Sequence, residues 1–423
     1  DAEGRLLTTL VGFVRDEWHE LSKEALGDDA ADALLDWSAL PQWRPGCGSL
    51  SVDPANAERL QAEAENSPLR ARRIEVASQD DDFEFMFDQG FSDGLPLVPP
   101  TPERVLKMLA GTSRDAQEVV AVMPPNMAEV TIEKIAVNSV MAGCRPEYLP
   151  VVIAAVEAVC TDEYNIHGVM ATTMGASPVM VINGPIRERL GMNMKLGALG
   201  QGNRANATIG RALRLVVRNM GGARPGGTER STLGNPMKFT MCFAEWEERN
   251  PWTSLHVERG FAKEDSVVSI FTMTSGPTLI VDQDSRSAAQ LAGSFGMSLE
   301  SAFHPRAHFA TEVLLVVCPE HVDTLTRDGF DKADIRARIQ EVTARPIRDL
   351  VADEQSAVGF KKAQAEQMSE EALDRLLPKF KNNEDIHIVV AGSDAGKFSG
   401  AFHGWATGEI GSIPVSKKIE ELL

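Results

Sequence analysis

Histidine and glutamate side chains in the run SLHVERG could handle protons or hold a metal ion. His256 and Glu258 are two residues apart, and on a strand both would point to the same face of the sheet. An imidazole beside a carboxylate can act as an acid–base pair or as ligands for a divalent metal, to which Glu245 in CFAEWEE would add a carboxylate. A strand that simply faces solvent would show the same pattern, so both interpretations stay open.

A basic, glycine-rich segment, residues 184–234, could bind a small anion. It contains nine Arg or Lys, two Glu and 11 of the chain's 34 glycines, whereas the whole chain has a formal net charge of -19. The string GQGNRANATIGRALRLVVRNMGG predicts a glycine loop and then a helix that Asn206 caps and Gly221 ends. Backbone N–H groups at such a helix start, near Gly202, Asn203 and Asn206, favour phosphate or carboxylate.

Three arginines of this segment form the predicted clamp for that anion. Arg204 and Arg211 lie near the positive end of the predicted helix, where each costs a few tenths to about 1 kcal/mol unless an anion lies beside it. With Arg214 they could bind a carboxylate or phosphate through two hydrogen bonds each. Asn183, at the end of the predicted strand PVMVING, would form a second wall. The alternative is a solvated arginine face that pairs with the acidic remainder of the chain.

Neither glycine loop of the chain matches a nucleotide-binding fingerprint. GQGNRA lacks the third glycine of GxGxxG. The loop GSDAGKFSG lacks the P-loop spacing, because Phe398 separates Lys397 from Ser399. Lys397 and the backbone N–H groups of that loop could still hold a carboxylate or phosphate, and an ordinary turn is the other interpretation.

Two further side chains could take part in catalysis. Cys144 lies beside Arg145, between a predicted helix that ends near Gly143 and another that begins near Pro146. A helix start and a cation both lower a thiol pKa, although a free cysteine can equally be a small buried hydrophobic residue. His167 precedes PVMVING and could reach a cleft, or it could be a structural histidine.

Alternating β-rich and helical runs predict the elements that position these residues. Thr101 and Pro102 predict a helix start. Strands are predicted in EVVAVMPP, PVMVING, SVVSIFTMT, PTLIVD, TEVLLVVCP and DIHIVVAG. That order predicts an α/β fold with a mixed or partly parallel sheet layered with helices. We expect a helical accessory segment at 1–78, an α/β domain with the basic segment at 92–310, and a second α/β domain or lobe at 311–423.

Composition restricts the partners and the compartment. With 423 residues and a pI near 4.9, the chain would repel nucleic acid and anionic membranes over most of its surface. Five scattered cysteines form no disulfide framework, which indicates a reducing compartment, and no run approaches the roughly 20 apolar residues of a membrane span. We therefore expect a cytoplasmic homo-oligomer that binds a small anionic substrate, without nucleic acid or membrane.

Several strings resemble a largely uncharacterised bacterial family that is associated with UGSC-like (seleno)proteins. They are SDGLPLVPPTPERV, AVNSVMAGCRPEYLPVV, ATTMGASPVMVINGPI, GNRANATIGRALRL, NPWTSLHVERG, CPEHVDTLTRDGFDKADIR and AGKFSGAF. They extend from Ser92 to Phe402. The nearest match to the motif that names the family, at Cys47 to Leu50, lacks the closing cysteine and lies outside that range. The resemblance implies no activity that can be assigned to residues.

Three functions fit these patterns. The favoured one is an enzyme that acts on a small carboxylate- or phosphate-bearing substrate by lyase or hydrolase chemistry. His256 and Glu258 would then transfer protons or hold a divalent metal, and Cys144 would be a nucleophile. The second is a thiol-dependent oxidoreductase that uses Cys144. The third is a non-catalytic assembly protein, in which the arginines pair with acidic surface on another subunit.

Overall fold

The computed structural model describes residues 19, 23, 29, 68–72, 74 and 81–420. The chain divides into two compact units, residues 1–85 and 86–423. Nearly all of the predicted helical segment 1–78 lies outside the described residues, as does Cys47. The elements below therefore belong to the second unit, except that helix α4 (Asp82–Asp88) spans the division.

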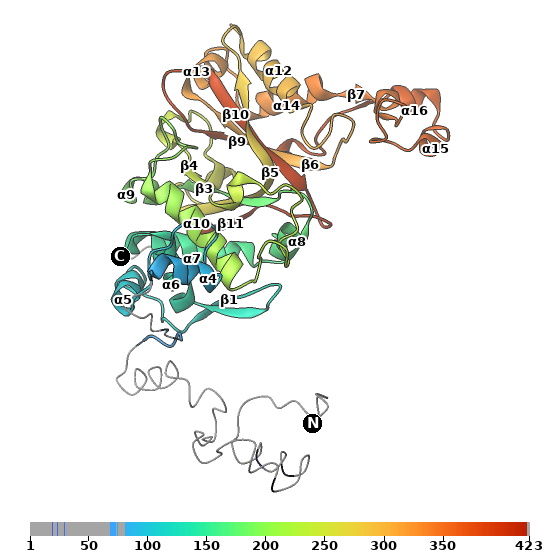
Figure 1. Ribbon diagram of the computed structural model, residues 1–423. Coiled ribbons are helices and arrows are strands. Elements are labelled where there is room, and N and C mark those ends of the chain that lie inside the picture. Colours follow the sequence, from blue (N-terminus) through green and yellow to red (C-terminus); the bar gives the residue numbers. More distant parts are fainter. Residues whose placement is uncertain are drawn as a thin grey trace. The chain divides into compact units, whose positions relative to one another are not determined.

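A seven-stranded sheet forms the centre of the second unit (Figure 1). The strands follow the order β4–β3–β5–β10–β6–β9, and β11 adds to β5. The pairs β3–β4 and β6–β9 are parallel, and the others are antiparallel. The strands are β3 (Ser177–Asn183), β4 (Cys242–Ala244), β5 (Val267–Val281), β6 (Thr311–Val317), β9 (Ile386–Val390), β10 (Phe398–Ala406) and β11 (Val415–Lys418). The predicted α/β fold with a mixed, partly parallel sheet is thus confirmed.

Strand β5 holds the two halves of the sheet together. Its first half pairs with β3 on one side and β11 on the other, and its second half pairs with β10. The sequence predicted two strands here, whereas the structure has one strand of 15 residues. The sheet also curls until its outer strands meet, since the N–H of Trp246, just after β4, donates to the carbonyl of Val390 in β9 over 2.7 Å. The curled sheet encloses an apolar interior.

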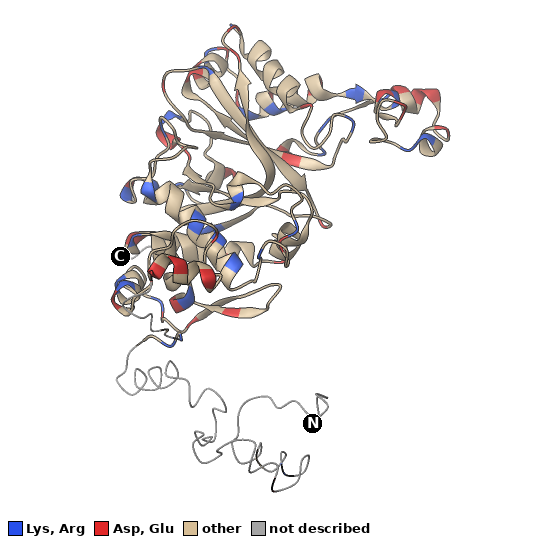
Figure 2. Ribbon diagram, viewed as in Figure 1, with Lys and Arg blue, Asp and Glu red and all other residues tan. Residues whose placement is uncertain are grey.

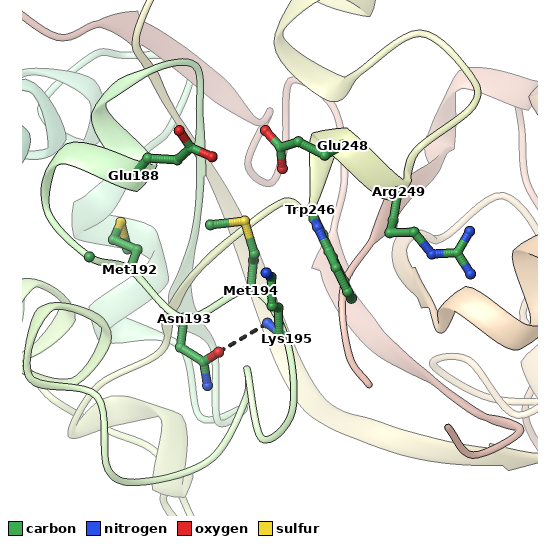
Figure 3. Close-up of a pocket in the computed structure, with 9 residues that line it drawn as sticks. Glu188, Met192, Asn193, Met194, Lys195, Trp246, Glu248 and Arg249 are labelled. Carbon is green, nitrogen blue, oxygen red and sulfur yellow. Dashed lines mark hydrogen bonds between the residues drawn. The ribbon is translucent and has the colours of Figure 1, made fainter. Parts of the chain in front are cut away.

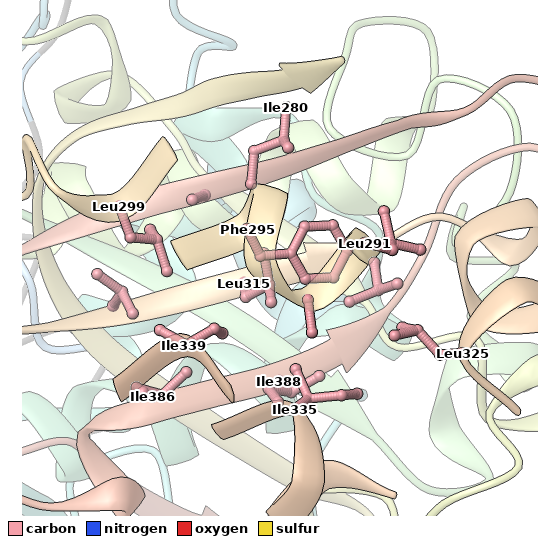
Figure 4. Close-up of a cluster of buried hydrophobic side chains, with 14 of the residues drawn as sticks. Ile280, Leu291, Phe295, Leu299, Leu315, Leu325, Ile335, Ile339, Ile386 and Ile388 are labelled. Atoms are coloured by element: carbon pink, nitrogen blue, oxygen red, sulfur yellow. The ribbon is translucent and has the colours of Figure 1, made fainter. Parts of the chain in front are cut away.

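Two apolar cores lie on opposite faces of the sheet. All seven residues of β6 are buried, because successive side chains of a strand point to opposite faces and both faces are covered. Leu314 and Val316 contribute to the enclosed interior, together with Phe271 and Phe402. Leu315 belongs to the second core, on the outer face (Figure 4). Each fully buried side chain of this size stabilises the fold by about 1.5–3 kcal/mol, so both faces must stay covered.

Two groups of helices cover the sheet (Figure 1). Helices α12, α13 and α14 pack on the half that contains β6 and β9, and helices α6, α7 and α10 pack near β3, β4 and β11. The longer helices are α5 (Pro102–Leu109), α6 (Ile132–Ala142), α7 (Leu149–Val159), α10 (Arg204–Asn219), α12 (Ala288–Leu299), α13 (Pro319–Arg327) and α14 (Lys332–Thr343). Among the described helices, none has the length and apolar character needed to cross a membrane.

Short elements connect these layers. The short strands are β1 (Val119–Met123), β2 (Ala128–Thr131), β7 (Arg345–Pro346) and β8 (Leu376–Leu377). The short helices are α8 (Ile166–Ala171), α9 (Ile186–Arg189), α11 (Leu255–Glu258), α15 (Lys362–Ala365) and α16 (Glu370–Asp374). Single 3-10 turns are η3 (Pro146–Tyr148), η4 (Pro236–Lys238), η5 (Glu247–Arg249), η6 (Ile347–Leu350) and η7 (Asn383–Asp385).

Two predicted helix ends are found where the sequence placed them. Helix α5 begins at Pro102, directly after Thr101. Helix α6 ends at Ala142, and Gly143 follows in the left-handed conformation with φ 88°. Strands β10 and β11 were not predicted, so the end of the chain contributes more to the sheet than its sequence indicates.

The boundary predicted at residue 310 does not divide the sheet. Strand β5 precedes it and strands β10 and β11 follow it, yet both pair with β5. Residues 86–423 accordingly form a single compact unit. The predicted domain 92–310 and the predicted lobe 311–423 are parts of that unit and share its central sheet.

Candidate functional site

The basic segment supplies arginines that are bound to carboxylates of the same chain. Lys and Arg recur along α9 and α10 (Figure 2). Arg211 makes a fork to the carboxylate of Asp93, with N–O distances of 2.8 and 2.9 Å, and also donates to the carbonyls of Leu95 and Pro96. Both side chains of the pair are mostly buried. The anion that Arg211 requires is therefore Asp93.

The other two arginines of the predicted clamp have different partners. Arg204 donates through Nε to the carbonyl of Gly143 over 2.9 Å. Arg214 is buried, donates to the carbonyl of Lys238 and lies 3.7 Å from the carboxylate of Glu229. The structure thus places the three arginines on one helix, each bonded to a different partner within the chain.

The start of helix α10 holds the loop that precedes it. Asn203 is the cap, since its side chain accepts the N–H of Asn206 over 3.0 Å. The prediction that Asn206 caps the helix is wrong. Asn206 is buried inside the first turn, where its amide accepts the N–H of Asn193 over 3.0 Å and donates to its carbonyl over 2.8 Å. Gly202, with φ 108°, turns the chain into the helix.

Parallel strands β3 and β4 end side by side, and the residues that follow form a buried polar network. Asn183 ends β3 and Glu245 follows β4. The carboxylate of Glu245 accepts from the side chain of Asn183 (2.7 Å), the side chain of Asn250 (2.8 Å) and the backbone N–H of Leu255 (2.9 Å). Burial, the largest influence, raises the pKa of Glu245, and these donors oppose it. Asn183, at the end of β3, thus helps to position the carboxylate of Glu245.

Arg187 of helix α9 is the buried cation of this network. Its Nε lies 3.1 Å from the carboxylate of Glu247, and its Nη2 lies 2.9 Å from that of Glu248. It also donates to the backbone carbonyls of Gly184 and Glu245, over 2.9 and 2.8 Å. The hydrogen bond from Arg187 lowers the pKa of Glu248, which stays charged at neutral pH. The sequence indicated a basic segment here but did not single out Arg187.

The predicted acid–base pair is not formed. Residues 255–258 are the short helix α11 rather than a strand, and side chains two apart on a helix do not face each other. His256 is fully buried and contacts the hydroxyl of Ser254 over 3.1 Å. Glu258 instead pairs with Lys332 over 2.6 Å. Across the described ranges, no three His, Cys, Asp or Glu side chains are grouped so as to hold a metal ion, and Glu245, His256 and Glu258 are no exception.

A pocket of about 680 Å³ opens at the carboxyl ends of β3 and β4 (Figure 3). We call it the Trp246 pocket. One wall is Glu188 and the loop 191–195, and the other is Trp246, Glu248 and Arg249. The volume lies within the range of small-molecule sites, and ligands of open sheets bind beyond the carboxyl ends of strands. Asn203 and Asn206 bind Gly191 and Asn193 of the loop wall, so they shape the pocket without lining it.

Lys195 is the cation of the Trp246 pocket that has no salt bridge to any described residue. Its Nζ lies 5.0 Å from the centre of the Trp246 ring. Arg249, the other lining cation, is bound to two aspartates outside the pocket over 2.9 and 3.0 Å. Trp246 is buried but Lys195 is exposed, and a cation–π contact at an exposed site gains only about 0.5–1 kcal/mol, so the ammonium can still bind an anion. Figure 3 also shows the carboxylates of Glu188 and Glu248 turned toward the same space.

The remaining predicted residues do not line this pocket. Cys144 is buried, its thiol lies 3.3 Å from the carbonyl of Thr208, and burial raises its pKa to about 12, opposite to the predicted direction. His167 is exposed on α8. Lys397 is half-buried in the glycine loop after β9, where the N–H of Gly396 donates to Glu320 over 2.5 Å. The carboxylate of Glu320 therefore already binds one of the backbone N–H groups that were predicted to hold an anion.

Cys318 has an environment that the sequence did not indicate. It directly precedes α13, and its backbone N–H donates to the hydroxyl of Ser399 over 3.1 Å. That hydroxyl lies 2.7 Å from Nδ1 of His321. Burial raises the pKa of Cys318, but the interactions with His321 and Ser399 together outweigh it, so the net shift is downward. All three side chains are buried, as expected for a group within the core.

The fold and the pocket together define an α/β protein with a small-molecule-sized pocket beyond two parallel strands. No protein-family model matches the chain, no curated protein matches it, and no solved structure matches it. The resemblance to the UGSC-like family therefore stays a prediction. Function has to be argued from the Trp246 pocket itself.

Proposed function

We propose that the protein is an enzyme whose small carboxylate- or phosphate-bearing substrate binds in the Trp246 pocket. The observation that carries this proposal is Lys195, a pocket cation without a salt bridge among the described residues, at the carboxyl ends of two parallel strands. The substrate's anionic group would accept hydrogen bonds from the Lys195 ammonium, while the Trp246 ring keeps that ammonium in place.

Proton transfer in this site is assigned to Glu188. Glu248 faces the same space, but its bond to Arg187 lowers its pKa, which makes it a weak base. Glu248 is therefore suited to orient the substrate as a charged acceptor. Glu188 lies on the opposite wall and can exchange a proton with a bound substrate, as lyase or hydrolase chemistry requires. This assignment replaces the predicted pair of His256 and Glu258, whose side chains are bonded elsewhere.

Binding of small anions to a Lys195→Met variant tests the proposal. A panel of small carboxylates and phosphate esters is titrated by calorimetry into the wild-type protein and the variant. A charge-assisted hydrogen bond is worth about 1.5–3 kcal/mol, so K195M should bind the best ligand roughly 10- to 100-fold more weakly. Lys263→Met, at an exposed lysine outside the pocket, is the matched control and should bind normally. Equal binding by K195M, or no binding of any panel member to the wild type, would disprove the proposal.

The proposed partners and compartment rest on the sequence. A net charge of -19 supports a protein that binds no nucleic acid, and the scattered cysteines support a cytoplasmic location. A homo-oligomer is also proposed. Native mass spectrometry gives the subunit number and detects a co-purified anion in one measurement. An oligomer that falls apart in high salt and never carries a ligand would favour the assembly protein over the enzyme.

A further inference from the structure

A second pocket, of about 250 Å³, lies where the segment with β7, β8, α15 and α16 leaves the sheet. We call it the Lys379 pocket. Its lining comes from residues 300–308, residues 343–350 and Lys379. Figure 1 shows the segment beyond β7 projecting away from the sheet. The Lys379 pocket shares no lining residue with the Trp246 pocket.

Lys379 is a buried ammonium with a single partner. Its side chain is 2% exposed, and its Nζ donates to the backbone carbonyl of His304 over 2.5 Å. No other hydrogen bond or salt bridge joins this Nζ to a described residue. An ammonium carries three donors, and a buried charge is stable only when partners satisfy it. Two donors are therefore left for a group inside the pocket.

Two carboxylates, Glu300 and Asp349, line the pocket, but neither forms a salt bridge with Lys379. Arg345 is hydrogen-bonded to Glu300, and Arg306 is bonded to Asp353 over 2.7 Å. The charged and titratable groups that line the pocket or lie around Lys379 are Glu300, His304, Arg306, His308, Arg345, Asp349 and His403. Burial lowers the pKa of both His308 and His403, so the two imidazoles stay neutral at neutral pH.

The main chain fixes Lys379 in this position. Its own carbonyl accepts the N–H of Phe309 over 2.9 Å, and the next N–H, of Phe380, donates to the side chain of Gln340 over 3.1 Å. Phe303 and Phe309, at the two ends of the neighbouring loop, both have φ 62°. Such a conformation is rare for an aromatic residue and persists only where the surrounding structure holds it. These contacts fix the backbone from which the pocket-lining side chain of Lys379 extends.

We propose that the Lys379 pocket binds a small oxyanion, such as sulfate, phosphate or a short carboxylate. The oxyanion would accept the two ammonium hydrogen bonds for which the described protein offers no acceptor. A volume of about 250 Å³ equals the liquid share of roughly eight waters, enough for an oxyanion and its remaining hydration but not for a nucleotide. This site is independent of the function proposed for the Trp246 pocket.

Sulfate is the probe for this site, because its charge does not change between pH 7 and about pH 9. Sulfate is titrated by calorimetry at constant ionic strength into the wild type and three variants. Lys379→Met should lose saturable binding. Lys381→Met, at an exposed lysine two residues away, and Lys195→Met, in the other pocket, should keep it. The result therefore separates this site from the Trp246 pocket.

The pH dependence of the wild type gives a second test that needs no variant. Burial lowers the pKa of Lys379 to about 8. Sulfate binds only the protonated amine, so its affinity should be full below that pKa and fall about tenfold per pH unit above it. Binding that is unchanged in K379M, binding that does not weaken above pH 8, or no saturable binding to the wild type would each overturn the proposal.

Discussion

Replacing Arg187 by methionine should destabilise the protein more than any neighbouring charge change. Arg187 is 4% exposed and contacts two carboxylates and two backbone carbonyls. Methionine fills a similar volume but donates no hydrogen bond. The carbonyls of Gly184 and Glu245 would lose buried donors, and Glu247 would lose its cation.

The expected loss is about 4 kcal/mol in the free energy of unfolding. Removing one partner of a buried ion pair costs roughly 3–5 kcal/mol, and each buried carbonyl left without its donor costs about 1–3 kcal/mol. The cost of the broken ion pair and the cost of the unpaired carbonyls overlap, and two features of the site make the total loss smaller than their sum. Glu248 is half-exposed, and Glu247 keeps the donors of Asn183 and Gly184. Arg187→Lys should lose about 2 kcal/mol, because an ammonium keeps the charge but cannot reproduce the planar fork.

Urea unfolding of the wild type, R187M, R187K and a control measures these differences. The control is Arg230→Met, at an exposed arginine of the same basic segment, with an expected change within about 0.5 kcal/mol. The pKa of Glu248 is lowered in the folded protein, so its contribution to stability is present above its ordinary pKa of about 4.3 and is lost as pH falls through the folded pKa. The gap between wild type and R187M should therefore narrow below pH 4. A loss under about 1 kcal/mol at pH 7, or a gap that does not change with pH, would refute the role given to Arg187.

Two further predictions concern residues that the sequence placed in the active site. Arg211→Met should lower the free energy of unfolding by about 2 kcal/mol, because it leaves the mostly buried carboxylate of Asp93 without its partner, and calorimetry should show unchanged anion binding. Lost anion binding in a stable variant would instead favour the predicted arginine clamp. Cys144 should resist iodoacetamide at pH 8 in the folded protein and react only in denaturant, since burial raises its pKa to about 12. Peptide mass mapping measures the modification. Rapid modification of the folded protein would support the alternative of a thiol-dependent oxidoreductase.

The sheet was predictable where strands are buried on both faces. Strands β3, β6 and β9 are rich in Val, Ile, Leu and Met, which is the pattern that a doubly covered strand favours. Strand β10 escaped prediction because two of its positions are glycine. A Cβ at Gly404 would lie 2.7 Å from the carbonyl oxygen of Glu312, and one at Gly400 would lie 3.0 Å from Pro277. The close approach of neighbouring strands requires glycine at these positions, whereas glycine in a sequence usually indicates a loop rather than a strand.

The site was less predictable because its contacts join distant segments. Arg211 and Asp93 are 118 residues apart, and nothing in the local pattern shows which carboxylate an arginine will meet. Asn183 was placed correctly at the end of a strand, since strand ends can be read from the apolar run. The short run CFAEWEE contains Trp246, but the sequence alone does not show that this run lies beside β3 as a parallel neighbour. The position of Trp246 at the pocket therefore could not be predicted.

An arginine count and the linings of the two pockets point to different parts of the chain. Each arginine that lines them, Arg249, Arg306 or Arg345, is bound to a carboxylate of the chain. Lys195 and Lys379 line them too, and neither has a salt bridge to a described residue. A planar guanidinium suits fixed, two-pronged pairing inside the fold, whereas an ammonium on a flexible stem binds as a point charge. In this acidic chain the arginines that line the two pockets have carboxylate partners within the protein, so the two lysines are the cations that we expect to meet a ligand anion.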